Sequence, residues 1–133
     1  MAEKDLHLTQ ARHNKKAAKH LLKNNCTFPD WVVTCAFYSA LHCFEAHLYE
    51  RRNDHTESLA QQLSISPHVF RKKIIHRNHR LIFQEWTDLY HECRIARYLV
   101  DLAKPAYKYF SKDDAEKLVH KMDKIRHYFG YQF

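Results

Sequence analysis

The sequence predicts an all-α fold, and its 133 residues have the length of a single domain, residues 1–133. The chain contains one glycine and three prolines, which leaves few positions for hairpins or bulges. No segment alternates apolar and polar residues between turn-forming residues, as a half-buried strand would. Residues 31–50, in contrast, contain neither glycine nor proline and are typical of one long helix. The 45% of apolar residues is enough for such helices to enclose a core.

The helix expected at residues 31–50 should lie at the centre of the fold. Its apolar residues fall on every side of a helical wheel, so other segments must cover its whole circumference. The polar residues His42, Glu45 and His47 argue against a membrane span, because placing them in hydrocarbon would cost several kcal/mol. We therefore expect a core helix and no association with a membrane.

Polar side chains form a stripe along this central helix. Tyr38, His42 and Glu45 recur at spacings of three and four residues, which places them on one face. A buried carboxylate requires a partner, and Arg94 or Arg97 of a later helix could supply it. One interpretation of these five residues is a functional groove in which His42 acts as a general base and an arginine binds phosphate. The other is a core polar network that fixes the register of two helices.

The segment before the central helix also has helical character. Residues 3–24 predict an amphipathic helix with a narrow apolar stripe, which we expect at the surface. Pro29 suits the first position of the central helix because its φ angle is already fixed near the helical value. Phe28 and Trp31 are placed to fix the direction in which the chain enters this helix.

Two short elements are expected after the central helix. Residues 51–55 are polar and predict a loop, after which Thr56 caps one or two turns that run to Gln62. Ser66 followed by Pro67 predicts a second start, with serine at the N-cap and proline at the first helical position. The helix that begins there should break near Asn78.

Two longer helices complete the chain. Residues 80–103 predict a helix that Pro105 ends and whose apolar stripe packs on the central helix. That stripe consists of Leu81, Ile82, Trp86, Leu89, Cys93, Ala96 and Val100. The last helix begins at Ser111, which caps it, with Asp113 and Asp114 in its first turn. Its core face consists of Ala115, Leu118, Val119, Met122, Ile125 and Phe129.

The charge of the chain favours acidic partners. Its 22 Lys and Arg exceed its 15 Asp and Glu, which gives a formal net charge of +7. Basic residues gather in segment 71–80, close to the expected first helix in a bundle, and could face phosphates. The candidates for nucleic-acid binding are Arg71, Lys72, Lys73, Arg77 and Arg80. The alternative is that the segment is simply a solvated helix face.

The cysteines and histidines do not form recognised metal or disulfide motifs. No C-x-x-C pair is present, and Cys35 and Cys43 would lie about 12 Å apart on one helix, too far for a disulfide. The first residues lack the apolar run of a signal peptide, so we expect reduced thiols and a cytoplasmic location. Pairs such as His42 with Glu45 lack a third ligand. We therefore expect no metal and no cofactor.

The order of several short motifs resembles that of the HEPN superfamily. In that family an aromatic-Tyr-x-Ala-Leu-His helix precedes an Ala-Arg-Tyr helix. The matching residues are Pro29-Asp30-Trp31, Phe37 to His42 with Glu45-Ala46 and Leu48, then His68 and Arg71, then Leu89, Cys93-Arg94 and Ala96-Arg97-Tyr98. The resemblance extends from about Pro29 to the last helix.

The resemblance implies an antiparallel bundle of four or five helices, often dimeric, from toxin–antitoxin, defence or RNA-processing systems. It implies binding of RNA or a nucleotide, or pairing with a protein such as a nucleotidyltransferase-like partner. Some members are metal-independent endoribonucleases that use an Arg and a His four to six residues apart. Arg71 and His76 have that spacing here, although they lie earlier than the family's site, and with His42 they are the catalytic candidates. An endoribonuclease and a purely structural dimerisation module remain the alternatives.

Overall fold

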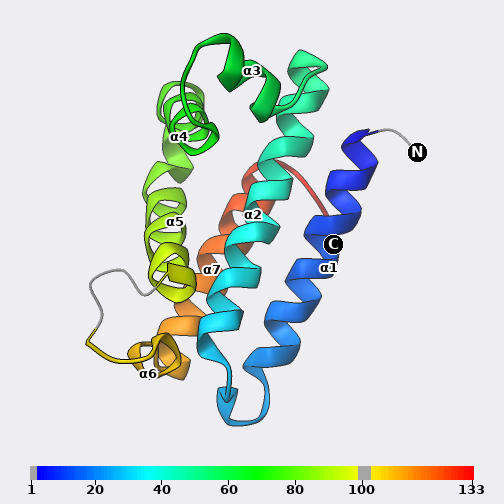
Figure 1. Cartoon of the computed structure of the whole chain (residues 1–133). Coiled ribbons are helices and arrows are strands. Elements are labelled where there is room, and N and C mark those ends of the chain that lie inside the picture. Colours follow the sequence, from blue (N-terminus) through cyan, green and yellow to red (C-terminus); the bar gives the residue numbers. More distant parts are fainter. Residues whose placement is uncertain (1–2, 99–102) are drawn as a thin grey trace.

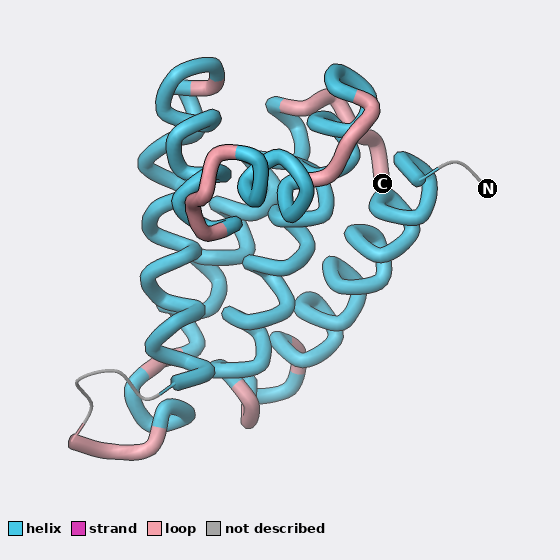
Figure 2. The backbone as a smooth tube through the Cα atoms, turned by 45° about the horizontal axis from the view of Figure 1, so that its top comes forward, coloured by secondary structure: helices cyan, strands magenta, loops and turns pink. Residues whose placement is uncertain are grey.

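The computed structural model describes residues 3–98 and 103–133, and all regular elements in these ranges are helices. The helices are α1 (Glu3–Leu22), η1 (Asn24–Cys26), α2 (Pro29–Arg52), α3 (Thr56–Gln62), α4 (Pro67–Asn78), η2 (Arg80–Ile82), α5 (Phe83–Tyr98), α6 (Ala106–Tyr109) and α7 (Lys112–Tyr128). The long helices α1, α2, α5 and α7 run along one another as a bundle (Figure 1). Helix α4 continues beyond the end of α5, and α3 crosses the same end of the bundle (Figures 1 and 2). The prediction of an all-α fold is confirmed.

Helix α2 is the central element, as its sequence predicted. It packs against α1, α5 and α7, and Val32, Val33 and Phe44 are fully enclosed. It begins at Pro29, the predicted first position, and extends two residues beyond residue 50. Its carboxyl end is closed by Asn53, which adopts a left-handed conformation (φ 51°) and donates its backbone N–H to the carbonyl of Tyr49.

Helix α1 packs more closely on α2 than a surface helix would. Ala11 and Ala18 are fully buried, and the Ser39 hydroxyl of α2 donates to the carbonyl oxygen of Ala11 at 2.8 Å. Small side chains along this line allow the two backbones to approach closely. The helix ends at Leu22, two residues before the predicted boundary, and the left-handed Asn25 (φ 64°) turns the chain toward α2.

Three apolar residues that the sequence placed against other residues lie in solvent instead. Phe28 and Trp31 are 52% and 56% exposed, so they do not fix the entry into α2. Leu81 is 79% exposed because the predicted helix at 80–103 begins as the 3₁₀ turn η2, which points this side chain outward. Ile82, Trp86, Leu89 and Cys93 are buried as predicted, whereas Val100 lies outside the described residues.

The helix starts predicted at Ser66-Pro67 and at Ser111 are correct in position, but only Ser111 has the predicted side-chain cap. Ser111 caps α7, since its hydroxyl accepts from the Asp114 N–H at 3.0 Å and Asp114 accepts from the Ser111 N–H at 2.9 Å. Ser66 stands at the N-cap of α4 without a side-chain cap bond, and the N-cap of α3 is His55 rather than Thr56. Helices α3 and α4 therefore depend mainly on tertiary packing.

The four cysteines are not joined by disulfides in the structure, and Cys26, Cys43 and Cys93 are buried. Within the described ranges, each helix is too short or too polar to cross a bilayer.

Candidate nucleic-acid interface

A groove with a volume of about 590 Å³ runs between α2, α4 and α5. It contains three arginines, Arg71, Arg94 and Arg97, and the single carboxylate Glu57. Aromatic rings make up much of its wall: Phe37, Tyr38, His68, Tyr90 and Tyr98. The remaining lining residues are Leu41, His42, Pro67 and Cys93. Cations and flat rings thus alternate along one surface.

Arg97 lies between two tyrosines of the groove. Its guanidinium donates a hydrogen bond to the Tyr38 hydroxyl, and its Cζ atom lies 5.4 Å from the Tyr38 ring centre and 5.1 Å from the Tyr98 ring centre. Burial raises the pKa of Tyr38, so its hydroxyl stays protonated near neutral pH. Tyr38 and Arg97, both assigned to the expected polar network, thus lie in contact and place an exposed guanidinium at the rim of the groove.

Arg94 and the rings beside it form the neighbouring part of the wall. Its guanidinium lies 6.0 Å from the Tyr90 ring centre, and its Nη1 donates to the Tyr90 hydroxyl at 3.4 Å. The Tyr90 ring stacks on His68 of α4, with centres 5.5 Å apart and an angle of 14° between the planes. Within residues 3–98 and 103–133, neither Arg94 nor Arg97 forms an ion pair with a carboxylate. Among the described residues, therefore, both charges remain available to a ligand.

Glu45 has a different partner from the one that the sequence suggested. The prediction that Arg94 or Arg97 neutralises it was wrong: Arg71 of α4 donates from Nε to Glu45 Oε1 at 2.9 Å. The backbone N–H of Thr56 donates to Oε2 at 3.3 Å. The side chains of Arg71 and Glu45 are only 13% and 5% exposed, so this ion pair is buried. The reason for the difference is that α4 reaches the Glu45 end of the Tyr38–His42–Glu45 stripe, whereas Arg97 of α5 reaches the Tyr38 end.

His42 faces a third set of residues. Its Nδ1 lies 3.0 Å from Nδ1 of His7, a residue of α1. Burial, followed by the charge of His7, lowers the pKa of His42 to about 4. The imidazole is therefore neutral near pH 7 but only weakly basic, which disfavours the general-base role considered above. The five residues expected to form one network therefore have separate partners. Tyr38 and Arg97 contact each other, whereas Arg94 contacts Tyr90, Glu45 contacts Arg71 and His42 contacts His7.

The comparison with known families supports the resemblance drawn from the motifs. A sequence model of the HEPN domain matches residues 5–130, which include every helix that lines the groove. The chain belongs to the HEPN family. No curated protein and no solved structure matches it.

The catalytic pair considered for this HEPN chain does not converge. Arg71 and His76 are five positions apart on α4, which places their side chains about 140° apart around the helix. Arg71 points to Glu45, whereas His76 is exposed and its ring centre lies 4.9 Å from that of Phe83. His76 is not part of the groove wall.

Of the basic residues predicted to bind nucleic acid, one lines the groove and the others lie outside it. Lys72, Lys73 and Arg77 of α4 are exposed, as is Arg80 of η2. These four residues do not line the groove, whereas Arg71 does. The first helix does not extend this basic face, because α1 and α4 lie on opposite sides of α2 (Figure 1). Sequence reasoning assigned no site role to His68 or Tyr90, since their stacking depends on how α4 is placed against α5.

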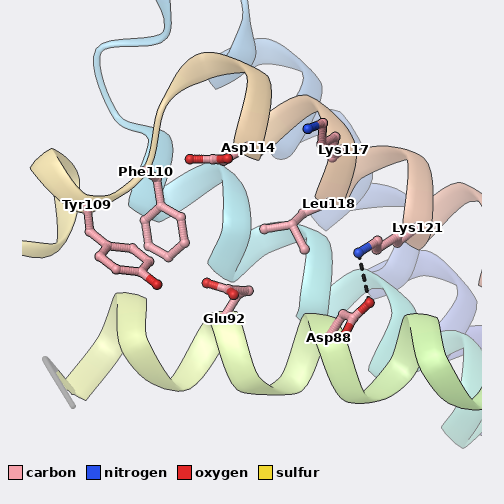
Figure 3. A pocket seen from close by; sticks show the side chains of 8 residues that line it. All are labelled: Asp88, Glu92, Tyr109, Phe110, Asp114, Lys117, Leu118 and Lys121. Carbon is pink, nitrogen blue, oxygen red and sulfur yellow. Dashed lines mark hydrogen bonds and ion pairs between the residues drawn. The ribbon is translucent and has the colours of Figure 1, made fainter. Parts of the chain in front are cut away.

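A second hollow of the HEPN domain, about 390 Å³, lies between α5, α6 and α7 (Figure 3). Its wall includes three carboxylates, those of Asp88, Glu92 and Asp114. Lys121 donates to Asp88 at 2.8 Å, and burial raises the pKa of Glu92. The carboxylates make this hollow a poor binding place for phosphate compared with the arginine-lined groove.

Proposed function

We propose that this HEPN domain binds single-stranded RNA in the groove between α2, α4 and α5. The observation that supports the proposal is the pairing of two guanidinium groups, free of carboxylate partners within the described residues, with a wall of aromatic rings. Arginine binds phosphate oxygens through two parallel N–H groups, and aromatic rings stack on unpaired bases. The groove has both kinds of side chain along one surface.

The charge of the groove agrees with an anionic ligand. Arg94 and Arg97 contribute two positive charges, while Glu45 compensates Arg71 inside the protein. Glu57 at the wall is the opposing charge. The chain as a whole has a formal net charge of +7, which favours encounter with polyanions.

The experiment is a fluorescence-anisotropy titration of a labelled single-stranded RNA with the full chain at several salt concentrations. We expect binding whose affinity falls as salt rises. Arg97→Ala and Arg94→Ala should each weaken binding about tenfold and lower the slope of log affinity against log salt by about 0.7, the value for one lost phosphate contact on a single strand.

The matched control is Arg77→Ala, which removes an exposed arginine from the outer face of α4. We expect it to change the affinity less than twofold. If Arg77→Ala weakened binding as much as Arg97→Ala, the outer face of α4 would be the binding surface instead. Binding that did not depend on salt, or no binding at all, would contradict the proposal.

The proposal does not include cleavage, because Arg71 and His76 point away from each other. The bound RNA should therefore stay intact on a denaturing gel after incubation with EDTA. Cleavage that His76→Ala abolished would favour the endoribonuclease alternative.

A further inference from the structure

A cluster of potential metal ligands lies at the end of the bundle where α1 begins and α2 ends. His7 of α1, Glu45 of α2 and His55 of the connection to α3 each offer one ligand atom, and these atoms lie within 4.8 Å of one another. Glu45 is buried, and the two histidines are partly exposed, so an ion could reach them from solvent. Segments that are distant in the sequence thus bring two imidazoles and a carboxylate together.

The separation of the two imidazoles matches the geometry of a tetrahedral site. Nε2 of His7 and Nδ1 of His55 are 3.4 Å apart. Two nitrogen ligands at about 2.0–2.1 Å from a tetrahedral zinc lie about 3.3 Å from each other. An ion between these two nitrogens therefore requires little movement of either ring.

Each of the three side chains is also held by a second group on its far side. The other ring nitrogen of His55 contacts the Glu3 carboxylate, and the other nitrogen of His7 lies 3.0 Å from His42. The carboxylate of Glu45 is oriented by Arg71 at 2.9 Å. Metal-binding histidines and carboxylates usually have such outer partners, which fix the tautomer and the direction of the ligand atom.

We propose that His7, Glu45 and His55 bind a divalent transition-metal ion of the zinc type, with water completing the coordination. Two imidazoles and one carboxylate are a ligand set that suits zinc and leaves a fourth position for water. The ion would connect the first turns of α1 to the end of α2 and the start of α3. This site does not depend on RNA binding in the groove, whose Arg94 and Arg97 it does not use.

The test is isothermal titration of the untagged full chain with ZnCl₂, together with Co²⁺ absorption as a report on coordination geometry. We expect one Zn²⁺ per chain, visible Co²⁺ bands typical of four-coordinate sites, and a rise in Tm on adding Zn²⁺. His55→Ala and His7→Ala should each weaken the affinity at least tenfold and abolish the rise in Tm.

Two further variants make the result decisive. Glu3→Ala removes only the exposed outer partner of His55, so the fold should persist while the affinity falls about tenfold. His20→Ala removes an exposed histidine of α1 outside the cluster and should leave the affinity unchanged. If no Zn²⁺ bound, or if His20→Ala had the same effect as His55→Ala, the metal site would be refuted. Far-UV circular dichroism of each variant shows whether its helices are intact.

Discussion

At the scale of single residues, the most consequential contact is the buried ion pair of Arg71 and Glu45. It lies between the groove and the proposed metal site, since Arg71 lines the groove while Glu45 is grouped with His7 and His55. A buried ion pair contributes modestly to stability, but removal of one partner leaves a charge without compensation. Glu45 then retains the Thr56 N–H as its hydrogen-bond donor within the described residues.

We expect Arg71→Ala to lower the free energy of unfolding by about 3 kcal/mol, because it leaves the carboxylate of Glu45 buried without a cation. Urea denaturation followed by circular dichroism measures this change. Arg77→Ala, an exposed position on the same helix, should change it by less than about 0.5 kcal/mol. If the two substitutions lowered the free energy of unfolding equally, the loss of the Arg71–Glu45 ion pair would not be the cause of the effect.

At the scale of helices, the sequence predicts starts better than it predicts which side chains cap them. Pro29, Pro67 and Ser111 each mark a helix start correctly because their effect on the backbone is local. Whether a serine actually caps depends on the rotamer that its neighbours allow, and Ser66 contacts His68 at 3.3 Å instead. The two serines therefore offer a matched comparison.

We expect Ser111→Ala to destabilise the protein by about 1 kcal/mol, since it removes an N-cap hydrogen bond at the start of α7. The bond from the Ser111 N–H also lowers the pKa of Asp114, so both halves of the cap are formed. Ser66→Ala removes a serine at the same type of position without a cap bond and should cost only a few tenths of a kcal/mol. Thermal unfolding of both variants measures the two losses of stability. Equal losses would contradict the conclusion that Ser111 caps its helix and Ser66 does not.

At the scale of the whole molecule, the all-α fold, the central helix and most of the core could be predicted from apolar periodicity. The way in which side chains from different helices come together in the candidate site could not be predicted from the sequence. Glu45 was recognised as needing a cation, but Arg94 or Arg97 was expected to supply it, and only the placement of α4 against α2 selects Arg71 instead. His7 was missed because nothing in the sequence near residue 7 indicates that α1 would place it beside His42 and His55.

The histidines give the fold a predictable pH dependence. Burial lowers the pKa of His47 and of His79, which face each other with Arg51 nearby. Their pKa values in the folded protein are thus below the unfolded value of about 6.5, so the unfolded chain binds protons first as the pH falls. Stability should be complete above pH 7 and fall toward pH 5.5, by less than about 1.4 kcal/mol for each histidine.

Urea unfolding at pH 7.5 and 5.5, in EDTA, measures this loss. His47→Phe keeps a ring beside Phe129 and should reduce the difference between the two pH values. His20→Phe, at an exposed position, should leave that difference unchanged. Stability that stayed constant or rose as the pH fell would be inconsistent with buried neutral imidazoles.

The two tryptophans differ in exposure to solvent, which allows their fluorescence to be separated in unfolding measurements. Trp31 is 56% exposed at the start of α2, whereas Trp86 is 2% exposed between Phe37 and Phe44 in the core. Iodide in the solvent therefore quenches the fluorescence of Trp31 and leaves that of Trp86. The emission that survives the quencher comes from the interior and reports directly on whether the packing around α2 is intact.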